Sequence, residues 1–186
     1  MNAYDLPTSL KIGEVDFPIN AGWRNMIDIF MEIRNPQHNQ NTKTAIMLCK
    51  LFPNWQYIPS DLIPEAIEKA RDFIDCGIKN EERKKPRSID WEQDAPLIIP
   101  AVNKVYGGTD IRLHPDIHWW TFFGWYMSIT DSLFSTVLHI RQKRIKGKKL
   151  VKWEEEFYRE NRKMVDFTEP ETDEIRQEKE NLLKWL

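Results

Sequence analysis

Residues 118–126 read His-Trp-Trp-Thr-Phe-Phe-Gly-Trp-Tyr, which places six Trp, Phe or Tyr side chains within nine residues. No charged side chain follows until Asp131. On a helix, one face would carry the residues spaced i, i+3, i+4 and i+7, which are Trp119, Phe122, Phe123 and Tyr126. A helix that is apolar almost all round is typical of a protein interior. We therefore expect this segment to be buried against helices that begin near Asn20 and Asp90.

The remaining side of that helix would be a narrow stripe of small residues, Thr121, Gly124 and Ser128. Such a stripe favours close approach of a neighbouring backbone, so the sequence predicts that Gly124→Leu overpacks the interface. The alternative interpretation is that the aromatic residues bind a cofactor or stack on nucleic-acid bases. Large aromatic residues at helical spacing more often form a core, however. The uncharged run is also too short to cross a bilayer, which needs about 20 apolar residues.

The composition indicates one domain, or one domain with an appended arm, because the chain has 186 residues and is 41% hydrophobic. The net charge of −2 does not by itself indicate a nucleic-acid or membrane partner. The first ten residues include Asp5 and Pro7 and resemble no signal peptide, so we expect an intracellular soluble protein. Cys49 and Cys76 are expected to be two buried free thiols in a reducing cytoplasm rather than a disulfide.

The elements expected from the pattern begin with a β-hairpin, in which Leu10–Ile12 and Val15–Ile19 flank a type II′ turn at Gly13-Glu14. Everything after it reads as helical. The expected helices are one capped by Asn20 and ending at Asn35-Pro36, Lys43–Phe52, one capped by Ser60 or Asp61 and ending at Gly77, one from Asp90 or Asp94 to Gly107, the aromatic helix, one capped by Asp131, Trp153–Phe167, and one from Glu171 to the end. The predicted fold class is mainly α: a compact bundle of seven or eight short helices with a small N-terminal β-hairpin.

The sequence motifs do not indicate a catalytic function. The chain has neither a Gly-rich phosphate loop nor a nucleophile elbow. His114 and His118 could share a metal on a helix, but Pro115 between them favours a helix start, with His118 in its first turn. The three acids 154–156 point in different directions on a helix and are expected to be a solvated face. We therefore expect a protein that is not an enzyme and that holds no cofactor or metal.

The charge layout divides the chain into two parts, 1–140, with the hairpin and the aromatic-cored helices, and 141–186, a basic segment followed by an acidic helical arm. Residues 141–152 contain seven Lys or Arg and no acid, whereas residues 153–186 contain six Lys or Arg and eleven Asp or Glu. The basic segment could bind phosphates, or it could pair with the acidic arm of its own chain or of another subunit. Nucleic acid is the less favoured partner, because no aromatic residues are interleaved with the basic ones.

The chain ends on four apolar side chains close to the C-terminus, Leu182, Leu183, Trp185 and Leu186. On a helix, three of them would share a broad side with Ile175, although Glu178 and Lys179 interrupt it. So weak a stripe needs a surface to pack on, because short helices depend on packing for stability. The surface could belong to the same domain, to a second subunit of a homo-oligomer, or to a client helix. These four residues are therefore the candidate partner-binding residues.

Taken in chain order, several stretches resemble the bacteriophage gene-product-fifteen proteins of long-tailed siphophages. The matching stretches are 10–20, Leu51-Phe52-Pro53 followed by Glu65-Ala66, Cys76-Gly77, 90–98, Tyr106-Gly107, His118-Trp119-Trp120 with Phe122, and Phe157-Tyr158-Arg159. Together they cover nearly the whole chain in the same order.

This resemblance implies a small α-helical protein encoded among tail genes and similar to tail assembly chaperones. Such proteins bind the long, helical tape-measure protein, or other tail proteins, in the host cell cytoplasm while the tail is built. None of the matching stretches is catalytic, so the resemblance assigns no active-site residue. The alternative hypotheses are a minor structural protein that is retained in the phage tail and a nucleic-acid-binding phage regulator that uses residues 141–152.

Overall fold

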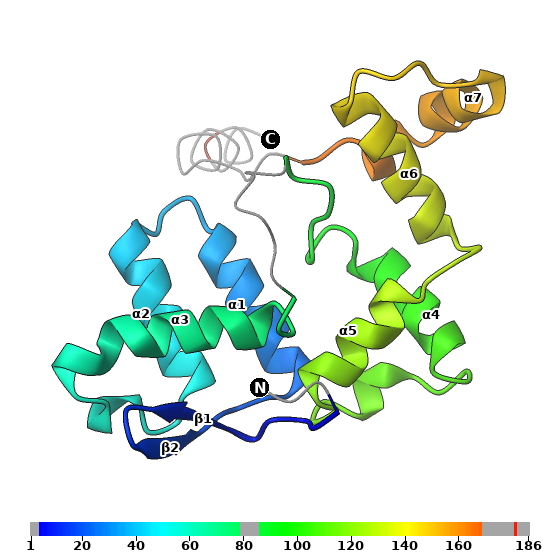
Figure 1. Cartoon of the computed structure of the whole chain (residues 1–186). Coiled ribbons are helices and arrows are strands. Elements are labelled where there is room, and N and C mark those ends of the chain that lie inside the picture. The colour runs from blue at the N-terminus through cyan, green and yellow to red at the C-terminus, as the bar shows by residue number, and fades with distance from the viewer. Residues whose placement is uncertain (1–3, 79–85, 169–180, 182–186) are drawn as a thin grey trace. The chain divides into compact units, whose positions relative to one another are not determined.

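The computed structural model describes residues 4–78, 86–168 and 181 of the chain. The chain divides into two compact units, residues 1–136 and residues 137–186. In the described ranges it contains eight α-helices, three short 3₁₀ helices and one two-stranded sheet, so the predicted mainly α fold class with its N-terminal hairpin is confirmed (Figure 1). No helix in these ranges is both long enough and apolar enough to cross a membrane.

The hairpin consists of β1 (Ser9–Ile12) and β2 (Val15–Pro18), paired antiparallel. Gly13 has a φ of +57° and Glu14 has no positive φ, as the predicted type II′ turn requires. A lone hairpin is marginal in water. Here β1 packs against α3, and the Glu65 carboxylate accepts the Gly13 amide hydrogen at 3.2 Å.

Helix α1 (Trp23–Arg34) begins after Gly22, so the prediction that Asn20 caps it is wrong. Gly22 is instead extended, because it pairs with His118 in the segment that leads into the aromatic helix. The Trp23 amide donates to the Ile117 carbonyl at 2.9 Å, and the Trp119 amide donates to the Ala21 carbonyl at 2.7 Å. The helix ends at Asn35, before Pro36, as predicted.

Helix α2 (Gln40–Leu51) begins three residues earlier than predicted, because the Asn39 side chain accepts the Thr42 amide hydrogen and caps it. Two 3₁₀ helices, η1 (Trp55–Tyr57) and η2 (Ser60–Leu62), lead to α3 (Ile63–Ile74). Ser60 and Asp61 were the predicted caps of α3, but both lie within η2 and neither caps α3. Its C-terminal glycine, Gly77, has the expected left-handed backbone, with a φ of +70°.

Helix α4 (Ala95–Val105) begins directly after Asp94, the start that Pro96 requires. The 3₁₀ helix η3 (Ile111–Leu113) leads to the aromatic helix α5 (Trp119–Met127), which packs against α1 and α4 as predicted. Trp119 and Phe122 are each 1% exposed. Phe123 and Tyr126 remain partly exposed, so only half of the predicted aromatic face is fully excluded from solvent.

Two predictions for the first unit are wrong: the close packing at Gly124 and the burial of both cysteines. Gly124 is exposed, and a Cβ placed on it would meet no atom within 4 Å, so no neighbouring backbone packs closely against it. The close approach of a neighbouring backbone occurs at Gly22, where a Cβ would lie 3.1 Å from the Pro115 carbonyl oxygen.

Both cysteines are free thiols, but Cys49 is exposed and Cys76 is only partly covered.

Helix α6 (Leu133–Ile145) leads into the second unit, which also contains α7 (Lys152–Glu160) and α8 (Arg162–Val165). Ser132, one residue after the predicted cap Asp131, accepts the Ser135 amide hydrogen through its hydroxyl at 3.0 Å. Gly147, with a φ of +64°, makes the predicted turn after α6. The predicted single helix Trp153–Phe167 is wrong, because it is interrupted at Asn161.

Candidate partner-binding groove

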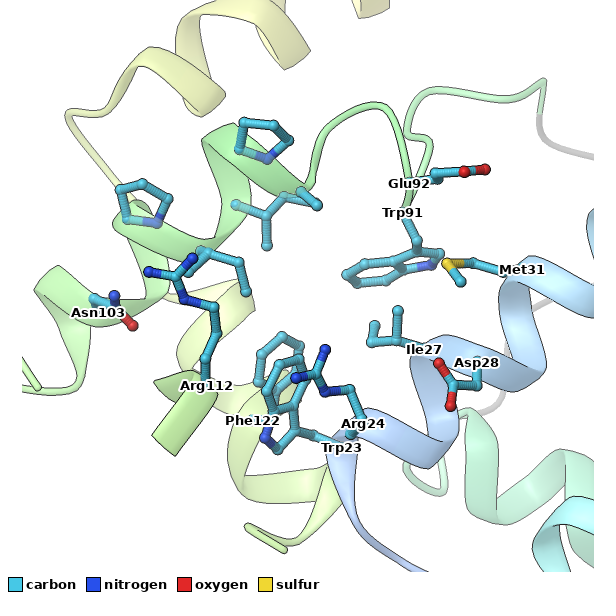
Figure 2. A pocket seen from close by; sticks show the side chains of 15 residues that line it. Trp23, Arg24, Ile27, Asp28, Met31, Trp91, Glu92, Asn103, Arg112 and Phe122 are labelled. Atoms are coloured by element: carbon cyan, nitrogen blue, oxygen red, sulfur yellow. The ribbon is translucent and has the colours of Figure 1, made fainter. Parts of the chain in front are cut away.

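The four partner-binding residues predicted from the sequence, Leu182, Leu183, Trp185 and Leu186, lie outside the described residues. The structure shows a different candidate in the first unit, a groove of about 560 Å³ with α1 on one side and α4 on the other (Figure 2). Its lining is mostly apolar.

The floor of the groove is aromatic. The Trp23 and Phe122 rings stack with their centroids 4.8 Å apart and their planes 7° from parallel. The Trp23 indole also donates to the His114 carbonyl at 2.9 Å, which fixes the orientation of its ring. Because both side chains are nearly excluded from solvent, the floor is a rigid extension of the core rather than a mobile surface.

The walls come from residues at helical spacing on two helices. On α1, Trp23, Ile27 and Met31 are four residues apart and form one stripe. On α4, the corresponding side chains are Ala95, Ile98 and Ile99. Trp91, which precedes α4, continues that wall.

The edge of the groove is partly exposed and adaptable. Met31 is 39% exposed, and a methionine at such a position suits a binding surface because its side chain is flexible and polarisable. This groove was not predicted from the sequence. The available signal was a second stripe on the same helix, displaced from the buried Met26 and Ile29.

Charged side chains surround the apolar lining. Arg24 and Asp28 rise from α1, Glu92 lies just before α4, and Arg112 comes from η3 (Figure 2). The Arg112 guanidinium binds both carboxylate oxygens of Asp110, and these hydrogen bonds hold the pKa of the Asp110 carboxyl far below its usual value. The arrangement is that of an apolar trough with a polar rim, which suits binding of an amphipathic partner.

The residues weighed for metal or nucleophile chemistry have other roles. His118 caps α5, since its Nδ1 accepts the Trp120 amide hydrogen at 3.1 Å and its Nε2 lies 2.9 Å from the Pro7 carbonyl oxygen. It therefore stands in the helix start, as expected, rather than as half of a metal pair with His114. Burial raises the pKa of the Cys76 thiol to about 12, which keeps the thiol protonated near neutral pH. Within the described ranges, no three His, Cys, Asp or Glu residues gather as a metal site would require.

The second unit contains the largest correction to the sequence analysis. Glu154 was expected on a solvated face, but it is 1% exposed. Its carboxylate accepts hydrogen bonds from Lys143 at 2.6 Å and from the Val151 amide at 2.7 Å, and it lies 3.0 Å from the His139 ring. Burial is tolerated because every one of these partners satisfies the carboxylate. The hydrogen bond from Lys143 is the main cause of the lowered pKa of this carboxyl.

Part of the basic segment is likewise used inside the second unit. Arg141 is buried and donates to the Val165 carbonyl at 2.6 Å, while its guanidinium stacks on Phe167. Arg144 pairs with Asp166. Of the alternatives left open by the charge layout, pairing with the acidic arm of the same chain is the one observed for Arg144, with Asp166, and for Lys143, with Glu154.

The chain is similar to one known protein family. It is a mainly helical protein whose residues 3–167 match the family model described as Bacteriophage Gp15 protein. The chain therefore belongs to the bacteriophage Gp15 family, which confirms the resemblance seen in the sequence. Neither a curated protein nor a solved structure matches it.

Proposed function

We propose that this phage protein is a non-enzymatic tail assembly factor, and specifically a tail assembly chaperone that binds the tape-measure protein in the host cytoplasm. The single observation that carries the proposal is the apolar groove between α1 and α4. Membership of the Gp15 family supports the phage origin, and the tail role comes from the resemblance noted in the sequence.

The shape and lining of the groove suit a helical client. An amphipathic helix binds in a groove between helices by inserting apolar side chains spaced i, i+3 or i+4, and i+7. The stacked Trp23 and Phe122 provide a preorganised floor for such side chains, and Met31 provides an adaptable edge. Long helices that expose apolar stripes aggregate unless the stripes are covered. An assembly chaperone prevents this aggregation by covering the stripes until the tail is built.

The proposal is tested by two matched methionine variants. Met31 lies in the groove, whereas Met127 is 64% exposed at the end of α5 and does not line it. Met31→Glu is expected to weaken capture of co-expressed tape-measure protein at least tenfold, because a carboxylate would have to be buried against the client. Met127→Glu is the control and should capture normally.

The readout is the amount of soluble tape-measure protein that co-purifies with each variant. Since both methionines are already partly or largely exposed, circular dichroism should show the same fold for both variants. Equal capture by the two variants would rule out the groove as the client site. Stoichiometric presence of the protein in purified virions would instead favour a structural role in the tail.

A further inference from the structure

We infer that the loop between α6 and α7 binds the C-terminal tail of the same chain, and that the tail covers the loop against other polyanions. The loop is residues 146–152, and the tail is residues 169–186, of which the structure describes residue 181 alone. Both segments belong to the second unit, so the contact does not depend on the groove of the first unit.

The loop carries positive charge that the rest of the described chain does not compensate. The other basic residues of the segment 141–152 are used inside the second unit. Four loop lysines are exposed and have no carboxylate within 4 Å among the described residues: Lys146, Lys148, Lys149 and Lys152. The exposed acids that follow the loop, Glu155 and Glu156, pair with none of them. An acidic occupant would therefore meet four available positive charges.

Hydrogen bonds fix the backbone of the loop at both ends. At its start, Gly147 has a φ of +64°, and its amide donates to the Arg144 carbonyl at 3.0 Å. At its end, the Val151 amide donates to the buried Glu154 carboxylate at 2.7 Å. Because the backbone is held, the four lysines stay near one another, and a bound acidic segment relieves their mutual repulsion.

Apolar side chains are exposed at the same loop. In the part of the second unit that the structure describes, the large apolar side chains that are exposed are Ile145, Val151 and Trp153, which lie in the loop or directly beside it. Trp153, at the start of α7, is 54% exposed. The loop is therefore suited to an occupant that is both acidic and partly apolar.

The C-terminal tail has that composition. It contains six Asp or Glu, all within 169–180, and three Lys or Arg. The described residues of the second unit, 137–168, have the opposite balance, with ten Lys or Arg and five Asp or Glu. The tail also carries Ile175 and the four apolar residues at the chain end. Charge and apolar character therefore favour the same occupant.

The tail begins within reach of the loop of its own chain. Asp166 pairs with Arg144, which precedes Lys146 by two residues on α6, or about 3 Å along the helix axis. An extended chain covers about 3.4 Å per residue, so the first acids of the tail, Glu169 and Glu171, can reach the loop. A segment tethered by so short a linker acts at a millimolar effective concentration, which favours the tail of the same chain over that of a second copy.

Carbodiimide crosslinking of the full chain tests the contact, because this reagent joins a lysine amine directly to a carboxylate that touches it. Mass spectrometry of the digested product should show links between acids of 169–180 and the loop lysines at low salt, and several-fold fewer links at about 0.5 M salt. Lys163 is the internal control, since it is exposed and closer to the tail in sequence. Links mainly to Lys163 or to lysines of the first unit would overturn the contact.

Isotope labelling distinguishes the tail of the same chain from that of a second copy. Equal amounts of ¹⁵N-labelled and unlabelled chain are mixed before crosslinking. Links within one chain join two peptides of the same isotope, which is the expected result. Mixed pairs in about half of the links would show that a second copy supplies the tail and would overturn the intramolecular contact.

The cover is tested by two variants of the full chain with the same net charge. One neutralises the tail (Glu171→Gln, Asp173→Asn and Glu174→Gln), and the control neutralises exposed acids of the first unit (Asp16→Asn, Glu68→Gln and Asp72→Asn). At low salt, the tail variant should bind a fluorescein-labelled oligothymidylate at least about fivefold more tightly than the wild type, because phosphates then reach the lysines. The control should bind like the wild type. No gain in the tail variant, or an equal gain in both variants, would overturn the cover.

Discussion

At the residue scale, Trp23 connects the fold with the candidate site. Its indole ring stacks on Phe122 inside the first unit, and the same ring forms the groove floor. The backbone of Trp23 pairs with Ile117, and its side chain donates to His114, so three separate contacts hold it in place. A surface fixed this firmly loses little conformational entropy when a partner binds.

Phe122→Ala is expected to destabilise the protein by about 3–5 kcal/mol, because the side chain is 1% exposed and stacks on two tryptophans. Urea denaturation measures the free energy of unfolding. Met127→Ala, at an exposed position of the same helix, is the control and should change it by less than about 0.5 kcal/mol. Similar losses in the two variants would show that the aromatic helix is not the centre of the core.

Two glycines are expected to respond in opposite ways to alanine. Gly124→Ala should stabilise the protein by about 0.5–1 kcal/mol, because Gly124 lies inside α5 and its added Cβ meets nothing within 4 Å. Gly22→Ala should destabilise it, because the new Cβ would lie 3.1 Å from the Pro115 carbonyl oxygen. Thermal melting compares the two variants directly, and a loss of stability in Gly124→Ala would contradict the open environment of α5.

At the element scale, periodicity in the sequence predicted most helices and the hairpin, but it predicted their starts less well. The residue that precedes α1 is Gly22 rather than the predicted Asn20. The reason is that residues 21–23 pair with a segment almost one hundred positions later, which no local signal in the sequence reveals. The start of α4 was predictable from Pro96, whose fixed backbone suits only a first helical turn.

The candidate site was less predictable than the fold. The groove depends on which two helices face one another, and the sequence contains no signal for that pairing. Of the run 154–156, Glu155 and Glu156 are exposed as predicted, whereas Glu154 was misjudged for a similar reason, because only its pairing with Lys143 of α6 shows that it faces inward. The charge pattern alone had left open the binding of phosphates and pairing with the acidic arm of the same chain or of another subunit.

The buried carboxylate in α7 gives the second unit a pH dependence. The folded-state pKa of Glu154 is lowered from its usual value of 4.5, chiefly by Lys143, so the ionised form stabilises the fold. This contribution is complete above about pH 4.5 and is lost as the pH falls through the lower folded-state pKa. Glu154→Gln should therefore be less stable than the wild type at pH 7, and the gap should narrow below pH 4.5 in urea denaturation. A gap that stays constant with pH would show that the ionised carboxylate has no such role.

At the scale of the whole molecule, two contacts hold the end of α8 to α6, since Asp166 pairs with Arg144 and Phe167 packs on Arg141. Deleting residues 171–186 removes none of these contacts. We therefore expect the truncated chain to keep its helical circular dichroism while self-association or capture of the tape-measure protein weakens. Unchanged capture would assign the arm, including Leu182 and Trp185, no partner role, and a failure to fold would make it part of the core.

The central claim is that a helical client lies in the groove of the first unit, and the methionine methyl groups report on it directly. Met31 lines the groove, Met127 is exposed elsewhere on the first unit, and Met26, also in α1, is fully buried. In NMR spectra of the chain labelled with ¹³C at its methionine methyls, helical fragments of the tape-measure protein should shift or broaden the Met31 signal and leave that of Met127 in place. Saturable binding that perturbs Met127 and leaves Met31 unchanged would contradict the account.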